Sequence, residues 1–232
     1  MSDSGVLERL RAQIARMRDV LPGGFGRASF AQEGEDLILA RIFENQPTGI
    51  YVDVGAHHPR RFSNTALLYR RGWHGVNIDA APGSMALFRQ LRPRDLNLEL
   101  GVGAKAEERE LFVFNEPALN TFDAARARAL ERPPYRITKV HKVRCAPLST
   151  ILAEHGIGAI DLLTIDAEGF DFEVLQTLDW TLSRPRIVLT EQFSRDLAAL
   201  MTSELHAFMD ARGYRLIAKT FNSVFYVRAD AP

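Results

Sequence analysis

Acidic side chains stand at or near the ends of four apolar, β-branched runs in this sequence. Asp53 lies inside the first run and is followed closely by Gly55, whereas Asp79, Asp166 and Glu191 close the later runs. Such runs are typical of buried parallel strands, and ligands of open α/β sheets bind in the crevice beyond the strands' carboxyl ends. We therefore predict that Asp53 and Gly55 open a nucleotide-type cofactor site and that the other acids share its rim.

The loop after the first run departs from the G-x-G-x-x-G pattern of dinucleotide sites. Gly55 is its only glycine, and Pro59 stands where the third glycine would fall. A pyrophosphate needs backbone N–H groups exposed by several glycines, whereas S-adenosylmethionine carries no phosphate. An ordinary strand-to-helix turn is the alternative. His57 and His58 lie at the mouth of this loop. One of them could act as a base or contact the sulfonium group of the cofactor, and the alternative is a hydrogen-bonding role at the start of a helix.

Asp79 follows the second run, 26 positions after Asp53. An acid at this point accepts hydrogen bonds from both ribose hydroxyls of a nucleotide, and the alternative is a solvated loop acid. Ala80 is expected beside it in the cofactor site. Val102, between two glycines at the end of the third run, is expected to flank the adenine, although a simple turn explains those glycines equally well.

Asp166 and Glu168 are the predicted catalytic acids, with His58 as a further candidate and Asp166 also contacting the cofactor. Carboxylates one residue apart can accept a hydroxyl proton, orient the hydroxyl or share a divalent cation. A helix N-cap is the rival role for Glu168. Glu191, another acid of the same rim, is a further candidate for this role. No Cys/His cluster has zinc spacing, and a divalent metal is not favoured.

The elements that position these residues follow from hydrophobic periodicity. Strands are predicted at 50–54, 76–79, 96–102, 160–166, 186–191, 214–220 and 223–227, and helices at 61–71, 82–91, 148–154, 170–178 and 203–212. The two-residue turn Phe221-Asn222 makes the last two strands an antiparallel hairpin. By fold-level analogy, such a hairpin separates methyltransferases from nicotinamide-dependent dehydrogenases. The prediction is a Rossmann-like α/β fold of the class I methyltransferase type, with a mostly parallel seven-stranded sheet in the order 3-2-1-4-5-7-6.

Two further segments complete the predicted organisation. An amphipathic helix over 4–20 forms an N-terminal unit (1–26) that caps the domain or packs on a partner subunit, which makes a homo-oligomer an expected arrangement. The domain itself is predicted to span 27–232. It carries an insertion at about 105–145 that we interpret as a lid or substrate wall.

Composition restricts the partners of the protein. Lys+Arg and Asp+Glu balance at 29 each in 232 residues, so no net charge attracts nucleic acid or an anionic membrane. Seven arginines crowd residues 60–94, where a solvated helix face is the favoured interpretation. The single Cys145, the lack of a signal peptide and the lack of a run of ~20 apolar residues predict a cytoplasmic protein without a membrane span.

With these residues in view, the sequence resembles the FkbM family of S-adenosylmethionine-dependent methyltransferases over residues 29–228. The motifs that carry the resemblance are Phe30–Leu37, Tyr51–His57, Asn77–Asp79, Ile165–Gly169 and, in a bacterial branch, His57-His58-Pro59, Pro93–Glu99 and Asn115–Thr121. The resemblance implies O-methylation of a sugar hydroxyl in polysaccharide, glycolipid or natural-product biosynthesis, with S-adenosylmethionine as methyl donor and a small molecule or glycan as acceptor. The alternatives are a non-catalytic module associated with glycan biosynthesis and a nicotinamide-dependent oxidoreductase.

Overall fold

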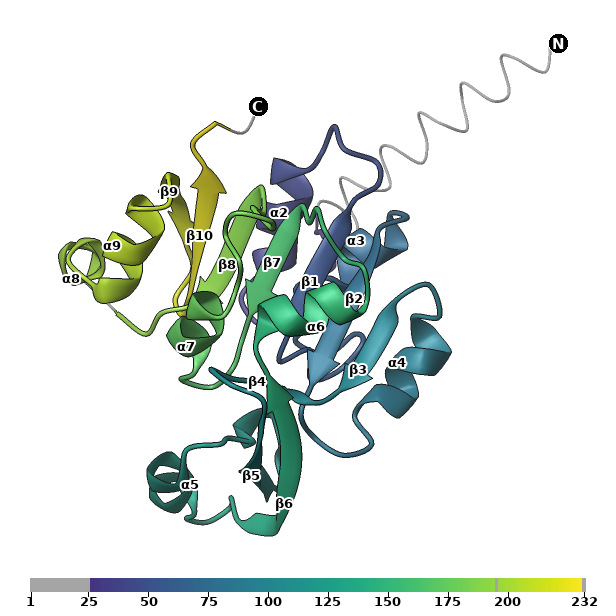
Figure 1. The fold of residues 1–232 in the computed structure, drawn as a ribbon, viewed down its shortest axis with the longest axis vertical. Helices are drawn as coiled ribbons and strands as arrows, with labels where there is room; N and C mark the ends of the chain where they lie inside the picture. The colour runs from purple at the N-terminus through teal and green to yellow at the C-terminus, as the bar shows by residue number, and fades with distance from the viewer. Residues whose placement is uncertain (1–25, 195, 231–232) are drawn as a thin grey trace, which may run out of the picture.

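The computed structural model describes residues 26–194 and 196–230, which fold around one mixed sheet (Figure 1). In spatial order its seven strands are β3 (Leu96–Glu99), β2 (His74–Asp79), β1 (Ile50–Val54), β7 (Leu162–Ile165), β8 (Ile187–Glu191), β10 (Ser223–Arg228) and β9 (Tyr214–Lys219). The first five are parallel, and β10 pairs antiparallel with both β8 and β9. This order and the closing hairpin confirm the predicted Rossmann-like α/β fold.

The parallel strands end level with one another. Ile78 pairs with Val54, Val54 with Ile165, and Ile165 with Thr190. The next residue on each of these strands therefore stands in one row along the sheet edge, and the row consists of Asp79, Gly55, Asp166 and Glu191. The register thus brings residues that are far apart in the sequence, such as Asp79 and Glu191, to the same edge of the sheet.

Alternating side chains divide the core into two layers, one on each face of the sheet. Val52, Leu163 and Val188 pack on the face covered by α6 (Leu148–Glu154), α7 (Asp171–Gln176) and α9 (Glu204–Asp210). On the opposite face, Tyr51, Leu162 and Ile187 pack with side chains of α2 (Glu35–Ile42) and α3 (Ala66–Arg70). Two short helices complete the body, α4 (Met85–Leu91) and α8 (Leu197–Met201). Because both faces are covered, the strands read as nearly continuous apolar runs.

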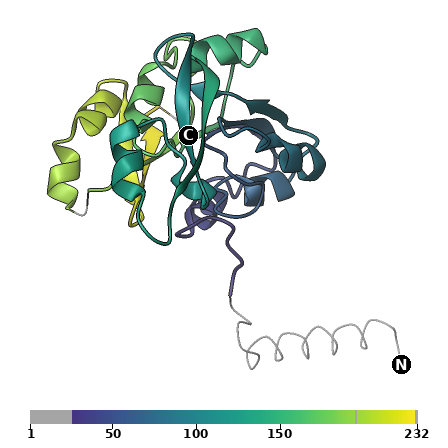
Figure 2. The ribbon, with the colours of Figure 1, turned by 90° about the horizontal axis from the view of Figure 1, so that it is seen from below.

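A second, three-stranded sheet projects from the carboxyl end of the first (Figure 1). It contains β4 (Gly101–Val102), β6 (Ile137–Ala146) and β5 (Glu107–Phe114), in that order, and between β5 and β6 lie the 3-10 helix η1 (Pro117–Leu119) and α5 (Ala124–Leu130). We call residues 107–146 the arm. Seen from below in Figure 2, the teal arm lies in the middle of the view, with the blue strands on one side and the yellow ribbon of the last strands on the other.

The structure differs from the sequence-based elements in three places. The run 96–102 forms two strands, and β4 leaves the main sheet to pair with β6 of the arm. The helix expected over 61–71 is reduced to α3, because Phe62 adopts a left-handed backbone (φ 56°) that a continuous helix does not allow. Helix α8 has no counterpart among the predicted elements. The expected helix at 4–20 lies outside the described residues.

Several of the crowded arginines have structural roles rather than forming a solvated face. Arg92 is 1% exposed and donates to the Pro59 carbonyl and to the Ser63 and Thr65 hydroxyls. Arg71 donates to the carbonyls of Ala40 and Phe43 at the end of α2. The prediction of a solvated face is therefore wrong for these two side chains. None of the helices in the described part of the chain is long and apolar enough to cross a membrane.

Candidate active site

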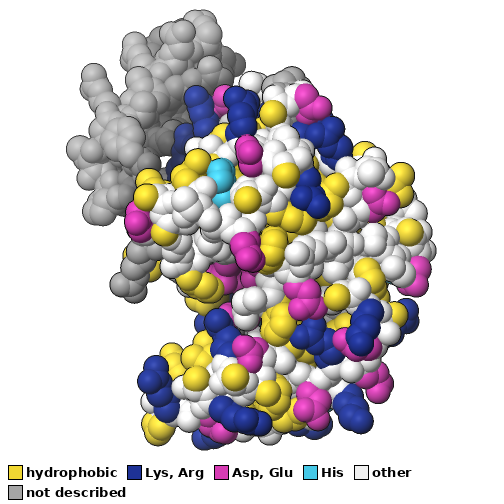
Figure 3. Space-filling model, turned by 60° about the vertical axis from the view of Figure 1, so that its left-hand side comes forward, with side chains coloured by type: hydrophobic (Ala, Val, Ile, Leu, Met, Phe, Trp, Pro, Cys, Tyr) yellow, Lys and Arg dark blue, Asp and Glu magenta, His cyan; other side chains and the backbone are white. Residues whose placement is uncertain are grey.

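A cavity of about 620 Å³ lies between the level strand ends and the arm. The space-filling view in Figure 3 is hollowed between the body and the arm, where hydrophobic and acidic side chains gather. The strand-end side of the lining comes from Gly55, His57, His58, Asp79, Ala80, Val102, Asp166, Glu168 and Glu191, and the arm contributes Leu111, Val113, Pro117–Phe122 and Arg126. Of the predicted site residues, Asp53 alone is absent from this lining.

Gly55 allows the backbones of two neighbouring strand exits to touch. Its φ is +77°, and a Cβ added there would lie 1.8 Å from the carbonyl oxygen of Asp166. Any other residue would push the loop after β1 away from the loop after β7. The close approach of the Asp166 backbone is therefore a structural reason for glycine at this position.

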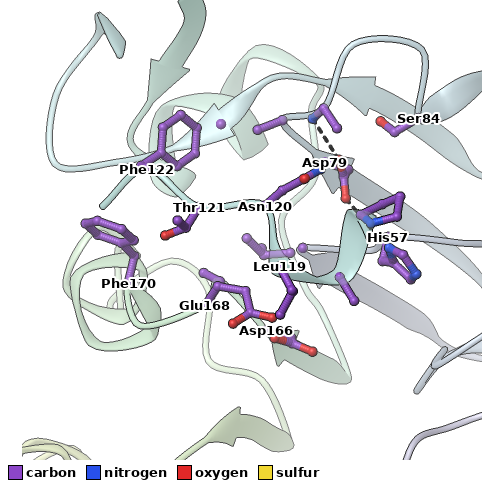
Figure 4. Close-up of a pocket in the computed structure, with 18 of the residues that line it drawn as sticks. His57, Asp79, Ser84, Leu119, Asn120, Thr121, Phe122, Asp166, Glu168 and Phe170 are labelled. Carbon is purple, nitrogen blue, oxygen red and sulfur yellow. Dashed lines mark hydrogen bonds between the residues drawn. The ribbon is translucent and has the colours of Figure 1, made fainter. Parts of the chain in front are cut away.

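Two backbone amides donate to the Asp79 carboxylate at the end of β2, beside His57 (Figure 4). Its Oδ2 accepts the backbone N–H of His57 at 2.9 Å, and its Oδ1 accepts that of Ala81 at 2.8 Å. Burial raises the pKa of this carboxyl above its ordinary value. Since a carboxylate oxygen accepts more than one hydrogen bond, both oxygens retain the capacity to bind hydroxyl groups in the cavity.

The backbone N–H groups of the first loop are already used within the protein. The amides of Gly55 and Ala56 donate to the carbonyl of Ile78, and that of His57 donates to Asp79. In dinucleotide sites the corresponding amides point at a pyrophosphate. This loop therefore offers a phosphate group no cradle of free amides from residues 55–57.

The two histidines differ in what their rings do. His58 Nδ1 accepts the backbone N–H groups of Arg60 and Arg61, at 3.0 and 2.9 Å, which places the ring proton of the neutral form on Nε2. The ring therefore stabilises the turn that follows β1 and has no free nitrogen lone pair for a substrate proton. His57 has a left-handed φ of 52°, and its ring stacks on Phe62 with centroids 6.2 Å apart. Burial lowers the pKa of both rings.

Asp53 lies below the cavity floor, in a buried polar cluster. Its Oδ2 accepts the Thr65 hydroxyl at 2.6 Å, and Arg92 donates to the same hydroxyl at 2.7 Å. Burial raises the pKa of Asp53 to about 6, which the Thr65 hydrogen bond and the charge of Arg92 partly oppose. The structure thus places the Asp53 carboxyl where it supports the first loop from beneath and not among the side chains facing the cavity.

Asp166 and Glu191 follow the paired residues Ile165 and Thr190 on neighbouring parallel strands, so their carboxyl groups are neighbours in the cavity lining. Burial raises the pKa of both, and so do the surrounding acids; the pKa of Glu191 reaches about 8, and that of Asp166 lies well above its ordinary range. Two neighbouring buried carboxyl groups disfavour double ionisation, which favours a proton shared by this pair.

Glu168 takes its direction from the turn after β7 and from the arm. It has a left-handed φ of 50° and is followed by Gly169 with φ 99°. Its carboxylate forms an ion pair with Arg126 of α5, where Asp123 caps the helix by accepting the Arg126 amide. Burial raises the pKa of Glu168, whereas the charge of Arg126 opposes that rise. The N-cap role considered for Glu168 is not the one seen, because Phe170 occupies the N-cap position of α7.

The arm adds an aromatic wall and two more ion pairs. The rings of Phe122 and Phe170 meet edge to face with centroids 6.3 Å apart, at the end of the cavity opposite His57 (Figure 4). The Arg109 guanidinium lies over both rings and pairs with Glu173 of α7 at 3.0 Å. Arg61 of the first loop pairs with Glu116 beside η1 at 3.2 Å. These contacts fix the arm as one wall of the cavity.

Sequence reasoning missed the cavity-facing residues of the arm and Phe170. The Arg126–Glu168 pair joins residues 42 positions apart, and no local pattern indicates such a pairing. The available signal was the Asn115–Thr121 motif, part of which forms the lining, and the position of the insertion beside the ligand crevice. Within residues 26–194 and 196–230, no three His, Cys, Asp or Glu side chains are grouped so that they could hold a metal ion.

Comparison with known proteins gave one family match. The model of the methyltransferase FkbM domain matches residues 53–216. A search of curated proteins found no match.

Solved structures similar to this chain share little sequence with it. An O-methyltransferase from Bacillus cereus in complex with SAH is 13% identical over 98% of this chain and 92% of that chain, with a TM-score of 0.49. A putative caffeoyl-CoA O-methyltransferase from Staphylococcus aureus is 9% identical over 97% and 98%, with a TM-score of 0.47. A precorrin-6y C5,15-methyltransferase from Geobacter metallireducens is 12% identical over 83% and 85%, with a TM-score of 0.44.

Proposed function

The chain belongs to the family of FkbM methyltransferase domains, and we propose that it is an O-methyltransferase that uses S-adenosylmethionine to methylate a hydroxyl group of a sugar or related small molecule. The observation that carries the proposal is the level row of strand ends. This row brings Asp79, the acid proposed to bind the ribose, to the same cavity as Asp166 and Glu191, the acids proposed for proton transfer, with the arm on the other side.

The cavity suits this cofactor in three respects. Asp79 is oriented by two backbone amides and lines the cavity, where its carboxylate would accept hydrogen bonds from the ribose hydroxyls. Ala80 and Val102 offer apolar surface for the adenine. The amides of residues 55–57 are used within the protein, which favours a cofactor without phosphate over a nicotinamide dinucleotide.

When bound, S-adenosylmethionine supplies a methyl group activated by a sulfonium cation. The residues of this chain would then align the acceptor oxygen, receive its proton and exclude water. At the exit of β7, Asp166 is a proposed residue for deprotonating the hydroxyl, and Glu168 is the proposed residue for positioning it. Arg126 would hold Glu168 in place. The wall of Phe122 and Phe170 would keep water from the reacting groups.

The charges of the lining favour a neutral acceptor. Its two arginines, Arg61 and Arg126, are paired with Glu116 and Glu168, and within the described residues no ion pair is formed by the carboxyl groups of Asp166 and Glu191. An anionic acceptor would meet these acids without compensation, so neutral sugars are the proposed class of acceptor and nucleic acid is not.

We further propose that the enzyme acts in the cytoplasm, within polysaccharide or related glycan biosynthesis, and needs no divalent metal.

Calorimetric titration with S-adenosylhomocysteine tests the cofactor. We expect micromolar binding to the wild type and a loss of about 100-fold or more in Asp79→Ala, because two hydrogen bonds to a charged group contribute about 1.5–3 kcal/mol each. Asp210→Ala, at an exposed position of α9, is the matched control and should bind normally. Tight binding of NAD in place of S-adenosylhomocysteine would overturn the proposal. Failure of the folded protein to bind either ligand would favour a non-catalytic module.

The acceptor class is tested by product formation. The wild type is incubated with S-adenosylmethionine and either neutral methyl glycosides or matched uronic acids and sugar phosphates, with and without EDTA. We expect S-adenosylhomocysteine to form with neutral sugars and EDTA to have no effect. Turnover confined to the anionic sugars, or abolished by EDTA, would contradict the proposed acceptor class or the proposed independence from metal.

A further inference from the structure

Asp166 and Glu191 form a carboxyl pair set by the sheet itself. Strands β7 and β8 are parallel with Ile165 opposite Thr190, so the next residue on each strand stands beside the other. Each ionised carboxyl group disfavours ionisation of the other at this separation, so a proton on one of them stabilises the pair. Both side chains line the cavity, where the proposed cofactor and acceptor meet.

Among the residues that the structure describes, no cation forms an ion pair with either carboxyl group of this pair. Asp171 at the start of α7 and Glu168 are further acids, and Arg126, the nearby cation, is paired with Glu168. The Asp171 carboxylate accepts the Thr190 hydroxyl at 3.3 Å and the Glu191 amide at 3.4 Å, which fixes the end of β8 but adds negative charge. Glu191 Oε2 is buried, and no hydrogen bond to it is made within the described residues.

We propose that the Asp166–Glu191 pair is the proton acceptor of the methyl transfer and that it distinguishes the cationic methyl donor from the neutral product by losing a proton when the donor binds. The proposal rests on the proposed function and deepens it. It makes Glu191 a catalytic residue, with Asp166 as the partner that shares its proton.

The charges balance through one turnover. The pair releases one proton to solvent when a cation occupies the cavity, because a nearby opposite charge favours the carboxylate. The pair then takes the acceptor's hydroxyl proton as the oxygen–methyl bond forms and the sulfur–methyl bond breaks, with the electron pair of the broken bond remaining on sulfur. A positive ligand beside a singly ionised pair thereby becomes a neutral ligand beside a neutral pair. The protein then no longer attracts the product by charge, which favours its release.

The pH dependence of ligand affinity follows from the raised pKa of the pair. Below pH 8 Glu191 is largely protonated, because burial and the charges of Asp171 and Glu168 raise its pKa to about 8. A ligand whose binding releases a proton gains affinity as pH rises toward that value, by at most about tenfold per pH unit. We expect this rise for S-adenosylmethionine and a much flatter profile for S-adenosylhomocysteine.

Calorimetry without acceptor tests the proposal on the intact chain. The binding enthalpies of S-adenosylmethionine and S-adenosylhomocysteine are measured near pH 7, with EDTA present, in buffers that differ in ionisation enthalpy. The dependence on buffer gives the number of protons exchanged. We expect about one more proton released with S-adenosylmethionine than with S-adenosylhomocysteine. Equal proton numbers for the two ligands would overturn the proposal while leaving the proposed cofactor in place.

Two variants assign the proton to the pair. In Glu191→Gln and Asp166→Asn we expect the difference in proton number to vanish, whereas Glu154→Gln, at an exposed position of α6, should retain it. Persistence of the difference in both pair variants would overturn the assignment. If the variants do not fold, the wild-type affinities between about pH 6 and pH 9 remain a test, since parallel profiles for the two ligands contradict the proposal. Failure of both ligands to bind would overturn the proposed function as well.

Discussion

The cavity has two sides that the protein builds differently. The strand-end side consists of backbone amides, glycines and acids that follow directly from the register of parallel strands, as in the row from Asp79 to Glu191. The arm side consists of side chains that reach across the cavity to the body, through the ion pairs Arg61–Glu116, Arg109–Glu173 and Arg126–Glu168.

This difference indicates a division between stability and selectivity. The strand-end side shares its backbone with the core, so a change there should reduce unfolding stability and cofactor binding together. The arm side is joined mainly through side-chain contacts at the cavity edge. A change there should alter acceptor turnover and leave cofactor binding nearly intact. The following predictions test whether the two sides separate in this way.

The largest effect is expected at Gly55. Gly55→Ala should lower the free energy of unfolding by about 4 kcal/mol and abolish cofactor binding, because the new Cβ overlaps the Asp166 carbonyl and φ is left-handed. Gly156→Ala is a matched control, since its φ is +66° but nothing lies within 4 Å of the added Cβ. It should cost about 1 kcal/mol. Denaturant unfolding of both variants measures this, and equal losses would show that close backbone approach is unimportant.

Arg92 should give the next largest effect, again on the strand-end side. Arg92→Met leaves Asp53 buried without its neighbouring cation and should lower unfolding stability by about 3 kcal/mol. Arg89→Met is the control, because Arg89 is 59% exposed and lies 4.0 Å from Glu99. Its loss should be below about 0.5 kcal/mol. A similar midpoint for both variants in urea would contradict the supporting role of the buried cluster.

On the arm side, Arg126→Gln should separate turnover from binding. We expect kcat/KM for the best neutral sugar to fall about 10- to 100-fold, because Glu168 loses a charged partner worth about 1.5–3 kcal/mol. The affinity of Arg126→Gln for S-adenosylhomocysteine should stay within about twofold of the wild-type value. The conservative variant Arg126→Lys should keep part of the activity that Arg126→Gln loses. Arg128→Gln, an exposed position on the same helix, serves as the control. Parallel losses of turnover and of S-adenosylhomocysteine affinity in Arg126→Gln would contradict the division of roles between the two sides of the cavity.

The smallest effect is expected at the aromatic wall. Phe122→Ala should raise the KM for the acceptor about fivefold, which corresponds to about 1 kcal/mol of lost apolar contact, with little change in cofactor affinity. Tyr135→Ala in the arm, 40% exposed and outside the lining, should change neither quantity. An unchanged KM in Phe122→Ala would place the acceptor elsewhere in the cavity.

Most of the strand-end side could be predicted from the sequence, because local patterns determine it. The apolar runs and the acids that close them predicted the strands, the two-residue turn at Phe221-Asn222 predicted the hairpin, and fold-level analogy supplied the strand order. The run 96–102 shows where this reasoning ends. A Cβ at Gly101 would lie 2.6 Å from Cys145 Sγ and 2.8 Å from the Phe122 ring, so its departure into the arm sheet depends on distant residues.

The arm side could not be derived in the same way, since its contacts join residues with no common local pattern. Arg109 and Glu173 are 64 positions apart, and Arg61 and Glu116 are 55 apart. Arg92 illustrates the same limit within the body, because nothing in its surroundings in the sequence distinguishes a buried arginine from a solvated one. Side-chain pairing across the fold is decided by tertiary contacts, which composition and periodicity do not encode.

The contact between Glu35 and the closing hairpin has a consequence for synthesis on the ribosome. Glu35 Oε1 accepts the hydroxyls of Thr220 and Ser223, and Glu33 accepts the amide of Asn222, across separations of 185 to 189 positions. At about 5–20 residues per second, the nascent chain waits roughly 10–40 s before these partners exist. Within that interval β8 waits for β10 only roughly 2–7 s, because Ile187 precedes Ser223 by 36 positions. The nascent chain would therefore expose the unpaired backbone N–H and C=O groups of β8 to chaperones until the closing hairpin is synthesised.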